Sequence, residues 1–281
     1  MTTSYTIRGT IGAPPGVVYG ALTDEAALRE WLAESADVAL ADGRFDFWGR
    51  FTPEGEPGRK RLLGCEPARS ISFSWLLQDT PTEVAISLAP AGEGETEVRL
   101  THANVPDRRS DYAAWVGDYL MMSLANLANF AEGRPVAPKC DFTALTEGEA
   151  RCAIQIGAPP AQVFASLIEP AQLERWIAEK AEVEPEVGGR YSFGWDHGPV
   201  KIVELVPDKV LAYSWQHTDA APETVVRWEL EGSGGGTYLT LVHSGFGPDR
   251  TPEGYQLGWQ EFLVSLRRMH EIGAGWRPFT R

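Results

Sequence analysis

Two histidines are the residues in this sequence best placed to do chemistry. His102 and His243 each end a stretch in which apolar side chains alternate with polar ones, so that Leu100 shares a face with His102 and Leu241 with His243. Because side chains alternate between the two faces of a strand, each imidazole should point to the inner, apolar side of a sheet. There it could form a hydrogen bond to a ligand or exchange a proton with it. Alternatively, it could stabilise the core through a hydrogen bond to a backbone carbonyl.

Large aromatic side chains share these inner faces, and the chain has ten tryptophans. Aromatic walls suit flat apolar molecules through stacking, whereas core packing is the alternative for each ring. The predicted ligand-binding residues are Trp75, His102, Trp115, Tyr119, Tyr213, Trp215, Trp228, His243, Trp259 and Phe262.

Other catalytic signatures are scarce. The sequence contains no HExxH or GxSxG motif and no cysteine and histidine at metal-ligand spacing. The cysteines, Cys65, Cys140 and Cys152, are odd in number and lack CxxC spacing, which argues against a disulfide framework or a zinc site. We therefore expect no metal, no cofactor and no catalytic residue of these kinds, and the sequence favours a binding protein over an enzyme.

The charge balance limits the classes of partner. The 25 basic and 39 acidic residues give a net charge of −14, and the longest basic run is Arg59–Arg61. Such a chain is a poor partner for nucleic acid or for an anionic membrane. It shows neither a signal peptide nor an apolar run long enough to insert into a membrane, so we predict a cytoplasmic location.

An internal repeat sets the domain organisation. The pentapeptide Ile-Gly-Ala-Pro-Pro occurs at Ile11–Pro15 and again at Ile156–Pro160, and residues 11–38 match residues 156–183 at half of the aligned positions. This extent indicates a duplicated domain. The predicted boundaries are residues 1–136 for the first domain, 137–148 for the linker and 149–281 for the second domain.

Each repeat presents its elements in the same order. A strand precedes the pentapeptide, which opens a short helix because proline suits the first helical turn, and a second short helix follows. Five strands and a long amphipathic helix complete the repeat. The predicted later strands are 44–48, 60–65, 70–77, 83–88 and 97–102, then 190–195, 200–205, 210–217, 224–230 and 238–243. Gly232–Gly236 is predicted to be a hairpin turn. This order predicts an α+β fold in which a curved antiparallel sheet wraps around the long helix of each domain.

The quoted segments also resemble a known family. IGAPPGVVYGALTDEAALREW, GRFDF, SFSW and LTHANVP in the first repeat, and GGRYSF, LAYSW and LVHSGFG in the second, resemble the AHSA1-like group within the Bet v1/START-like (SRPBCC) superfamily. The resemblance implies two tandem helix-grip domains, each with a hydrophobic cavity between sheet and helix. The first repeat has HANVP where the second has the more typical HSGFG, so the second repeat is expected to keep the ancestral role.

What the resemblance implies about function leaves three classes open. Binding or sequestration of a hydrophobic or aromatic small molecule comes first, and it includes antibiotic self-resistance of the enediyne type. In that case Gly245 and Gly247 are candidate sacrificial glycines, because an unshielded Cα–H can quench a diradical. A polyketide aromatase or cyclase and an Hsp90-type cochaperone, which would need a protein partner, are the alternatives.

Overall fold

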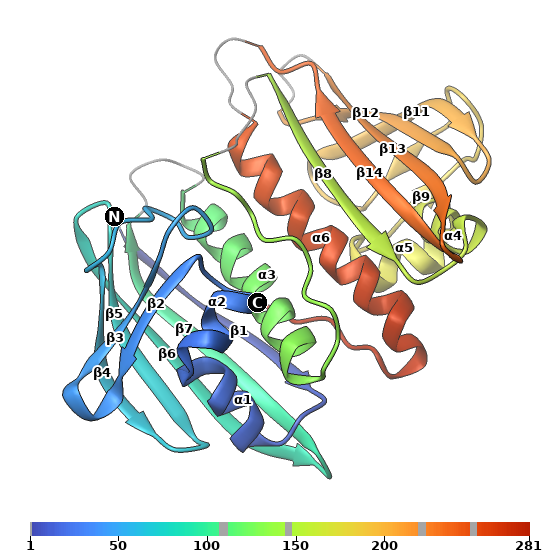
Figure 1. Cartoon of the computed structure of the whole chain (residues 1–281). Helices are drawn as coiled ribbons and strands as arrows, with labels where there is room; N and C mark the ends of the chain where they lie inside the picture. The colour runs from blue at the N-terminus through green and yellow to red at the C-terminus, as the bar shows by residue number, and fades with distance from the viewer. Residues whose placement is uncertain (1, 107–111, 144–147, 219–222, 248–251) are drawn as a thin grey trace. The chain divides into compact units, whose positions relative to one another are not determined.

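A computed structural model of the whole chain divides it into two compact units (Figure 1). The structure describes residues 2–106, 112–143, 148–218, 223–247 and 252–281. The first unit consists of Met1–Ala144 together with Arg277–Arg281, and the second consists of Leu145–Trp276. The residues assigned from the sequence to the start of a linker therefore group with the first unit, as does the segment that follows the second.

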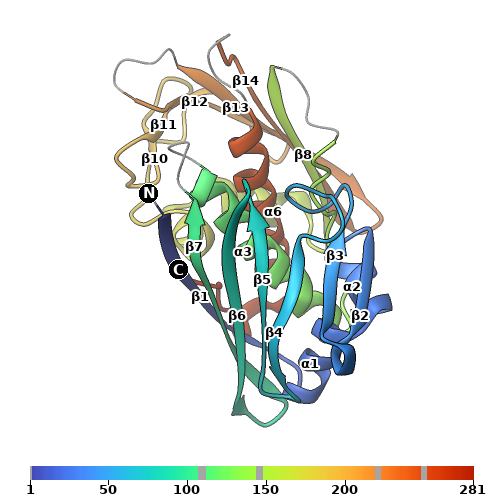
Figure 2. The ribbon, with the colours of Figure 1, turned by 90° about the vertical axis from the view of Figure 1, so that its left-hand side faces the viewer.

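The first unit is built on a five-stranded antiparallel sheet that curves around a long helix (Figure 2). The strand order is β1-β7-β6-β5-β4. The bounds are β1 Thr2–Ile11, β4 Lys60–Glu66, β5 Ser70–Leu77, β6 Thr80–Gly92 and β7 Glu95–Pro106. The helices are α1 Pro15–Thr23, α2 Glu25–Trp31 and the long α3 Tyr112–Ala131, with the 3-10 turn η1 Leu40–Asp42.

The second unit repeats this architecture. Its five antiparallel strands lie in the order β11-β12-β13-β14-β8. The bounds are β8 Glu149–Ile156, β11 Gly198–Val206, β12 Val210–Gln216, β13 Thr224–Ser233 and β14 Gly236–Ser244. The helices are α4 Pro160–Ile168, α5 Pro170–Trp176 and α6 Glu253–Ile272, followed by the 3-10 turn η2 Gly273–Gly275. The predicted fold, two tandem helix-grip domains, is confirmed.

The repeated pentapeptide starts the first helix of each unit. Its second proline is the first residue of α1 and of α4, where the missing N–H leaves no donor unpaired. In each unit, a threonine on the strand that comes last in sequence, β7 or β14, donates a hydrogen bond to the alanine carbonyl before the helix. Thr96 Oγ1 donates to the Ala13 oxygen at 2.6 Å, and Thr237 Oγ1 donates to the Ala158 oxygen at 2.7 Å. The pentapeptide is therefore an architectural element.

A two-stranded hairpin accompanies each five-stranded sheet. β2 (Ser35–Ala39) pairs with β3 (Arg44–Trp48), and β9 (Glu182–Val183) pairs with β10 (Tyr191–Ser192). The sequence analysis missed β2 and β9. Its prediction of a strand over residues 190–195 was too long, because Gly194 leaves the extended conformation at a φ of 79°.

The glycine-rich segment forms the predicted hairpin turn. Gly234 and Gly235 have φ values of 57° and 87°, and they connect the paired ends of β13 and β14. Two consecutive positive φ values are typical of a tight hairpin turn that glycine adopts without steric cost.

Arg277–Arg281, which we call the return segment, completes the first unit. Arg8 and Thr280 exchange two backbone hydrogen bonds, of 2.8 and 2.9 Å, so the segment pairs with the free edge of β1. The Phe279 ring lies over Gly9, where an added Cβ would come within 2.2 Å of the ring. Arg281 forms an ion pair with Asp118 of α3. The sequence analysis had assigned these residues to the second domain.

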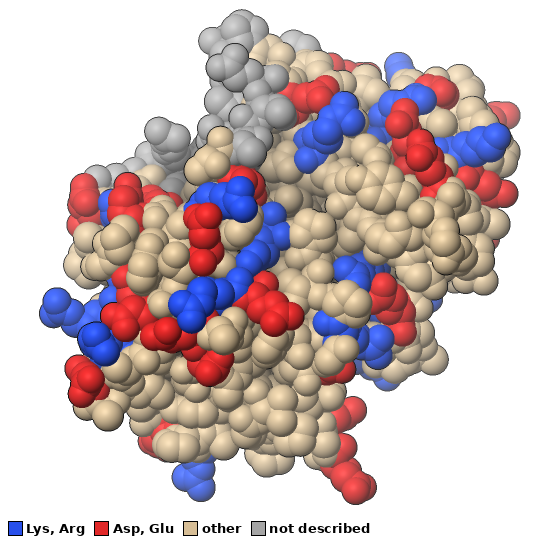
Figure 3. Space-filling model, viewed as in Figure 1, with Lys and Arg blue, Asp and Glu red and all other residues tan. Residues whose placement is uncertain are grey.

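The surface carries charges of both signs. On the face shown in Figure 3, acidic and basic side chains are interspersed over both units. In the described part of the chain, no helix is long and apolar enough to cross a membrane.

Candidate functional site

His102 lies on the inner face of the first sheet and is hydrogen-bonded within the core. Its Nε2 is 2.8 Å from Thr82 Oγ1, and that hydroxyl donates its single proton to the Trp75 carbonyl oxygen at 2.7 Å. Nε2 must therefore carry a proton and donate it to Thr82. Nδ1 is then an acceptor, and it receives the Tyr5 hydroxyl at 3.0 Å. Burial lowers the pKa of His102 to about 3, so the ring is neutral near pH 7.

His243 has the same arrangement in the second unit. Its Nε2 is 2.6 Å from Thr224 Oγ1, which donates to the Trp215 carbonyl oxygen at 3.3 Å. Its Nδ1 accepts from Trp259 Nε1 at 3.1 Å. An indole N–H can only donate, so this bond fixes the Nε2-protonated, neutral tautomer of His243.

The hydrogen bonds of both histidines favour a structural role. Each ring nitrogen is engaged by a side chain of the same unit, so no proton or lone pair is left to exchange with a substrate. The partners are side-chain hydroxyl and indole groups and not the backbone carbonyl that the sequence analysis considered. The repeated histidine and threonine pair ties together the strands on which the aromatic side chains lie.

The candidate aromatic residues of the second unit are packed against one another. The ring centroids of Trp215 and Trp259 are 5.2 Å apart, and those of Trp228 and Trp259 are 5.8 Å apart. Trp228 Nε1 donates to the Tyr213 hydroxyl at 3.1 Å. Phe262 is half-buried and contacts Trp259 with a centroid distance of 6.1 Å. These aromatic side chains thus form one cluster of contacting rings.

In the first unit, a small apolar cavity lies between the sheet and α3. Its volume is about 30 Å³, which gives room for a water molecule or two and is far below the roughly 300–1,000 Å³ of an ordinary ligand pocket. The side chains that line it include Phe45, Phe47, Phe73, Tyr119, Ser123 and Leu124. The candidate residue Tyr119 is therefore part of the wall of this cavity.

Three buried polar groups belong to residues that line this cavity or contact its lining, and they have no hydrogen-bond partner among the described residues. They are Trp75 Nε1, the Tyr119 hydroxyl and Lys60 Nζ. The Trp75 ring centroid is 5.9 Å from that of Tyr119. Burial raises the pKa of Tyr119, and the opposite effect of Ser123 is smaller. The Ser123 hydroxyl donates its proton to the Tyr119 carbonyl oxygen at 2.7 Å. Buried polar groups are normally paired, so this cluster calls for an explanation.

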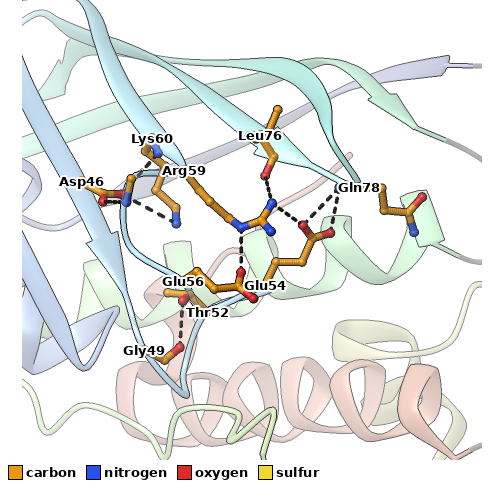
Figure 4. A network of polar contacts seen from close by, with 10 residues as sticks. Asp46, Gly49, Thr52, Glu54, Glu56, Arg59, Lys60, Leu76 and Gln78 are labelled. Atoms are coloured by element: carbon orange, nitrogen blue, oxygen red, sulfur yellow. Dashed lines mark hydrogen bonds and ion pairs between the residues drawn. The ribbon is translucent and has the colours of Figure 1, made fainter.

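Lys60 is the residue of this cluster that the sequence analysis missed. In the sequence it is part of the basic run Arg59–Arg61, which gives no sign of a buried position. In the structure it is the first residue of β4, pairs with Trp75 across the sheet and is buried. Its Nζ lies 4.6 Å from the Phe47 ring centroid and 5.1 Å from the Trp75 centroid. It is 4.0 Å from Asp46 Oδ1 (Figure 4). Strand alternation could have revealed it, because Lys60 is two residues before the apolar Leu62.

The remaining candidates lie outside these interiors. Trp115 on α3 is half-buried, with its ring centroid 5.2 Å from that of Phe142. Gly245 and Gly247, which follow β14, are both exposed. Within the residues that the structure describes, no group of three or more histidine, cysteine or acidic side chains could hold a metal ion.

The architecture and the paired histidines define a tandem helix-grip protein. The family described as "Activator of Hsp90 ATPase homolog 1-like protein" matches residues 12–132 and again residues 157–271. The chain therefore belongs to this AHSA1-like family, with one family domain in each unit. No curated protein that was compared with the chain matches it.

Several solved structures are similar to parts or all of the chain. Protein MLL2253 from Mesorhizobium loti is 27% identical, with 44% of this chain and 98% of that chain covered and a TM-score of 0.41. The Aha1 dimer from Colwellia psychrerythraea is 26% identical, with 45% and 98% covered and a TM-score of 0.40. DynU16, a protein of the dynemicin biosynthetic locus, is 16% identical, with 96% and 98% covered and a TM-score of 0.35.

Proposed function

We propose that the first unit binds a hydrophobic small molecule between its five-stranded sheet and α3. The observation that carries this proposal is the apolar cavity, whose lining includes Tyr119 with a buried hydroxyl that has no partner among the described residues. A buried polar group without a partner costs about 1–3 kcal/mol, so a ligand with an acceptor oxygen would recover free energy that the empty site loses.

The comparison of the two units supports the first as the binding unit. In the second unit, Trp228, Trp259 and Tyr191 direct their donors to protein acceptors. From its sequence motifs, the second repeat was expected to keep the ancestral role. The cavity of the first unit, with the Tyr119 hydroxyl in its wall, supports the opposite assignment.

The size of the cavity means that binding requires side chains to move. Phe45 and Phe47 line the cavity from β3, which pairs with β2 and not with the five-stranded sheet. This hairpin is held to the sheet partly by the Asp46 carboxylate, which accepts from the backbone N–H groups of Gly58 at 2.6 Å and Lys60 at 3.2 Å. Displacing the hairpin breaks fewer backbone hydrogen bonds than separating two strands of the sheet.

Binding without chemistry on the ligand is the form of the proposal that the histidines favour. A cyclase would need a side chain that exchanges protons with its substrate, and both ring nitrogens of His102 and of His243 are already engaged. Sequestration of an antibiotic such as an enediyne would be one use of such a site. Gly245 and Gly247 are exposed and lend that use no support as sacrificial residues.

The test is a fluorescence titration with N-phenyl-1-naphthylamine, a neutral apolar probe that brightens when it leaves water. We expect saturable binding by the intact protein. Leu124→Phe adds volume to the cavity wall, and we expect it to weaken binding by about tenfold or more, which corresponds to 1.4 kcal/mol.

Leu63→Phe is the matched control, because Leu63 is on the same unit but 54% exposed. It should leave the affinity unchanged, and the melting temperatures of both variants check that they fold. Absence of saturable binding, or equal affinity of the Leu124→Phe variant and the original protein, would refute the proposal.

A further inference from the structure

Lys60 is a buried ammonium group with little to compensate its charge. Its side chain is fully buried, and its Nζ makes no hydrogen bond to the described residues. Among the described residues, the one acidic group in ion-pair range is Asp46, at 4.0 Å. The faces of Phe47 and Trp75 supply further attraction, although such contacts replace only part of the lost hydration.

Asp46 is itself largely engaged elsewhere. Its Oδ1 accepts the backbone N–H of Phe47 at 3.0 Å and that of Lys60 at 3.2 Å, and its Oδ2 accepts that of Gly58 at 2.6 Å. These three bonds fix the carboxylate on the backbone side of the hairpin. The three N–H donors of the Lys60 ammonium group remain without an acceptor at hydrogen-bond distance.

The second unit shows that the fold does not need this lysine. Lys60 pairs with Trp75 across β4 and β5, and the residue that pairs with Trp215 across β11 and β12 is Pro199. The aligned motifs GRFDF and GRYSF place Ser192 where the first repeat has Asp46. The buried charge therefore occurs in the unit with the cavity described above, and uncharged residues occupy the equivalent positions of the second unit.

We propose that Lys60 selects the ligand of the first unit, which is an apolar molecule that carries one acidic oxygen group such as a carboxylate or a sulfonate. This inference rests on the proposed function of the unit. The apolar body of the ligand would occupy the space at Tyr119 and Leu124, and its anionic oxygen would reach the ammonium group that lies against Phe47. The Trp75 ring lies 5.1 Å from Lys60 Nζ, and its Nε1 is a further buried donor without a partner among the described residues.

The test compares two probes with the same anilinonaphthalene skeleton. N-phenyl-1-naphthylamine is neutral, and 8-anilino-1-naphthalenesulfonate adds one sulfonate. We expect the sulfonate to bind the original protein more tightly than the neutral probe. Lys60→Met should weaken the sulfonate by at least about tenfold and leave the neutral probe unchanged or slightly tighter.

Lys201→Met is the matched control, because it removes one positive charge from an exposed position. It should change neither affinity, whereas Lys60→Arg should retain part of the preference for the sulfonate. If Lys60→Met fails to fold, Lys60→Gln keeps the test open, because it removes the charge and preserves polarity.

The outcomes separate the two proposals. If neither probe binds the original protein, the proposed function fails. If the neutral probe binds at the cavity and the sulfonate is no tighter, or if Lys60→Met weakens both probes equally, the assignment of Lys60 fails while the proposed function stands. Loss of the sulfonate preference in the Lys60→Met variant alone supports the assignment.

Discussion

Replacement of Lys60 by methionine should stabilise the protein in the absence of ligand. Burial is the largest cause that lowers the pKa of Lys60, from the ordinary 10.5 to about 8, and Asp46, Glu54 and Glu56 offset it only in part. A pKa difference of this size corresponds to about 3 kcal/mol at the usual 1.36 kcal/mol per pH unit. Methionine has a similar shape without the charge, but it loses the attraction to the two rings, worth about 1–2 kcal/mol. The expected net gain in unfolding free energy is about 1–3 kcal/mol near pH 7.

The gain should depend on pH in a definite direction. Below about pH 8 Lys60 is protonated in both the folded and the unfolded protein, so the folded state bears the whole cost of the buried charge. Between pH 8 and 10.5 the unfolded state binds more protons than the folded state, and the stability of the original protein rises with pH. The advantage of the Lys60→Met variant should therefore be largest below pH 8 and should disappear towards pH 10.5.

Chemical unfolding followed by tryptophan fluorescence at several pH values measures this difference. Lys201→Met serves as the control, because Lys201 is exposed and its loss should leave the unfolding free energy within about 0.5 kcal/mol at each pH. The reasoning is refuted if Lys60→Met destabilises the protein at pH 7. It is equally refuted if the variant is more stable by the same amount at pH 7 and at pH 10.

Two further predictions concern the hydrogen bonds and ion pairs of the first unit. Because its pKa is about 3, the imidazole of His102 should remain neutral and protonated at Nε2 between pH 8 and 5, and a nitrogen NMR spectrum that showed it titrating in this range would contradict the assignment. The cost of keeping His102 neutral should lower the stability as the pH falls from 6.5 towards 3. Arg281→Met should lower the unfolding free energy by about 1–2 kcal/mol, because it leaves the partly buried Asp118 carboxylate without its cation. Adding Asp118→Asn should restore most of that loss, and additive losses in this double-mutant cycle would show that the pair contributes nothing.

Most of the fold could be predicted from the sequence, because its signals are local. The prolines of the pentapeptide indicate helix starts, the glycines at 234 and 235 indicate a turn, and alternation identifies most strands. β2 was missed because Ser35–Ala39 contains one β-branched residue, Val38, and depends on pairing with β3. The short β9 depends in the same way on β10.

The candidate site was harder to predict, because its properties depend on three-dimensional packing. Alternation along the strands predicted that the side chains of His102 and His243 point inward. Their partners Thr82 and Thr224 lie on neighbouring strands and could be found only from the strand register. The size of the cavity in the first unit depends on how rings from several elements fit together. Lys60 was overlooked because a lysine within a basic run is usually exposed.

The return segment makes the first unit depend on the second during synthesis. Domains ordinarily fold one after another as the chain leaves the ribosome. Here Thr280, which pairs with the edge of β1, and Arg281, the partner of Asp118, are translated only after the whole of the second unit. Until then, the edge of β1 at Arg8 is unpaired and the carboxylate on α3 lacks its counterion. The first unit therefore lacks these contacts while the second unit is being synthesised. It can complete its fold only after the second unit has been translated.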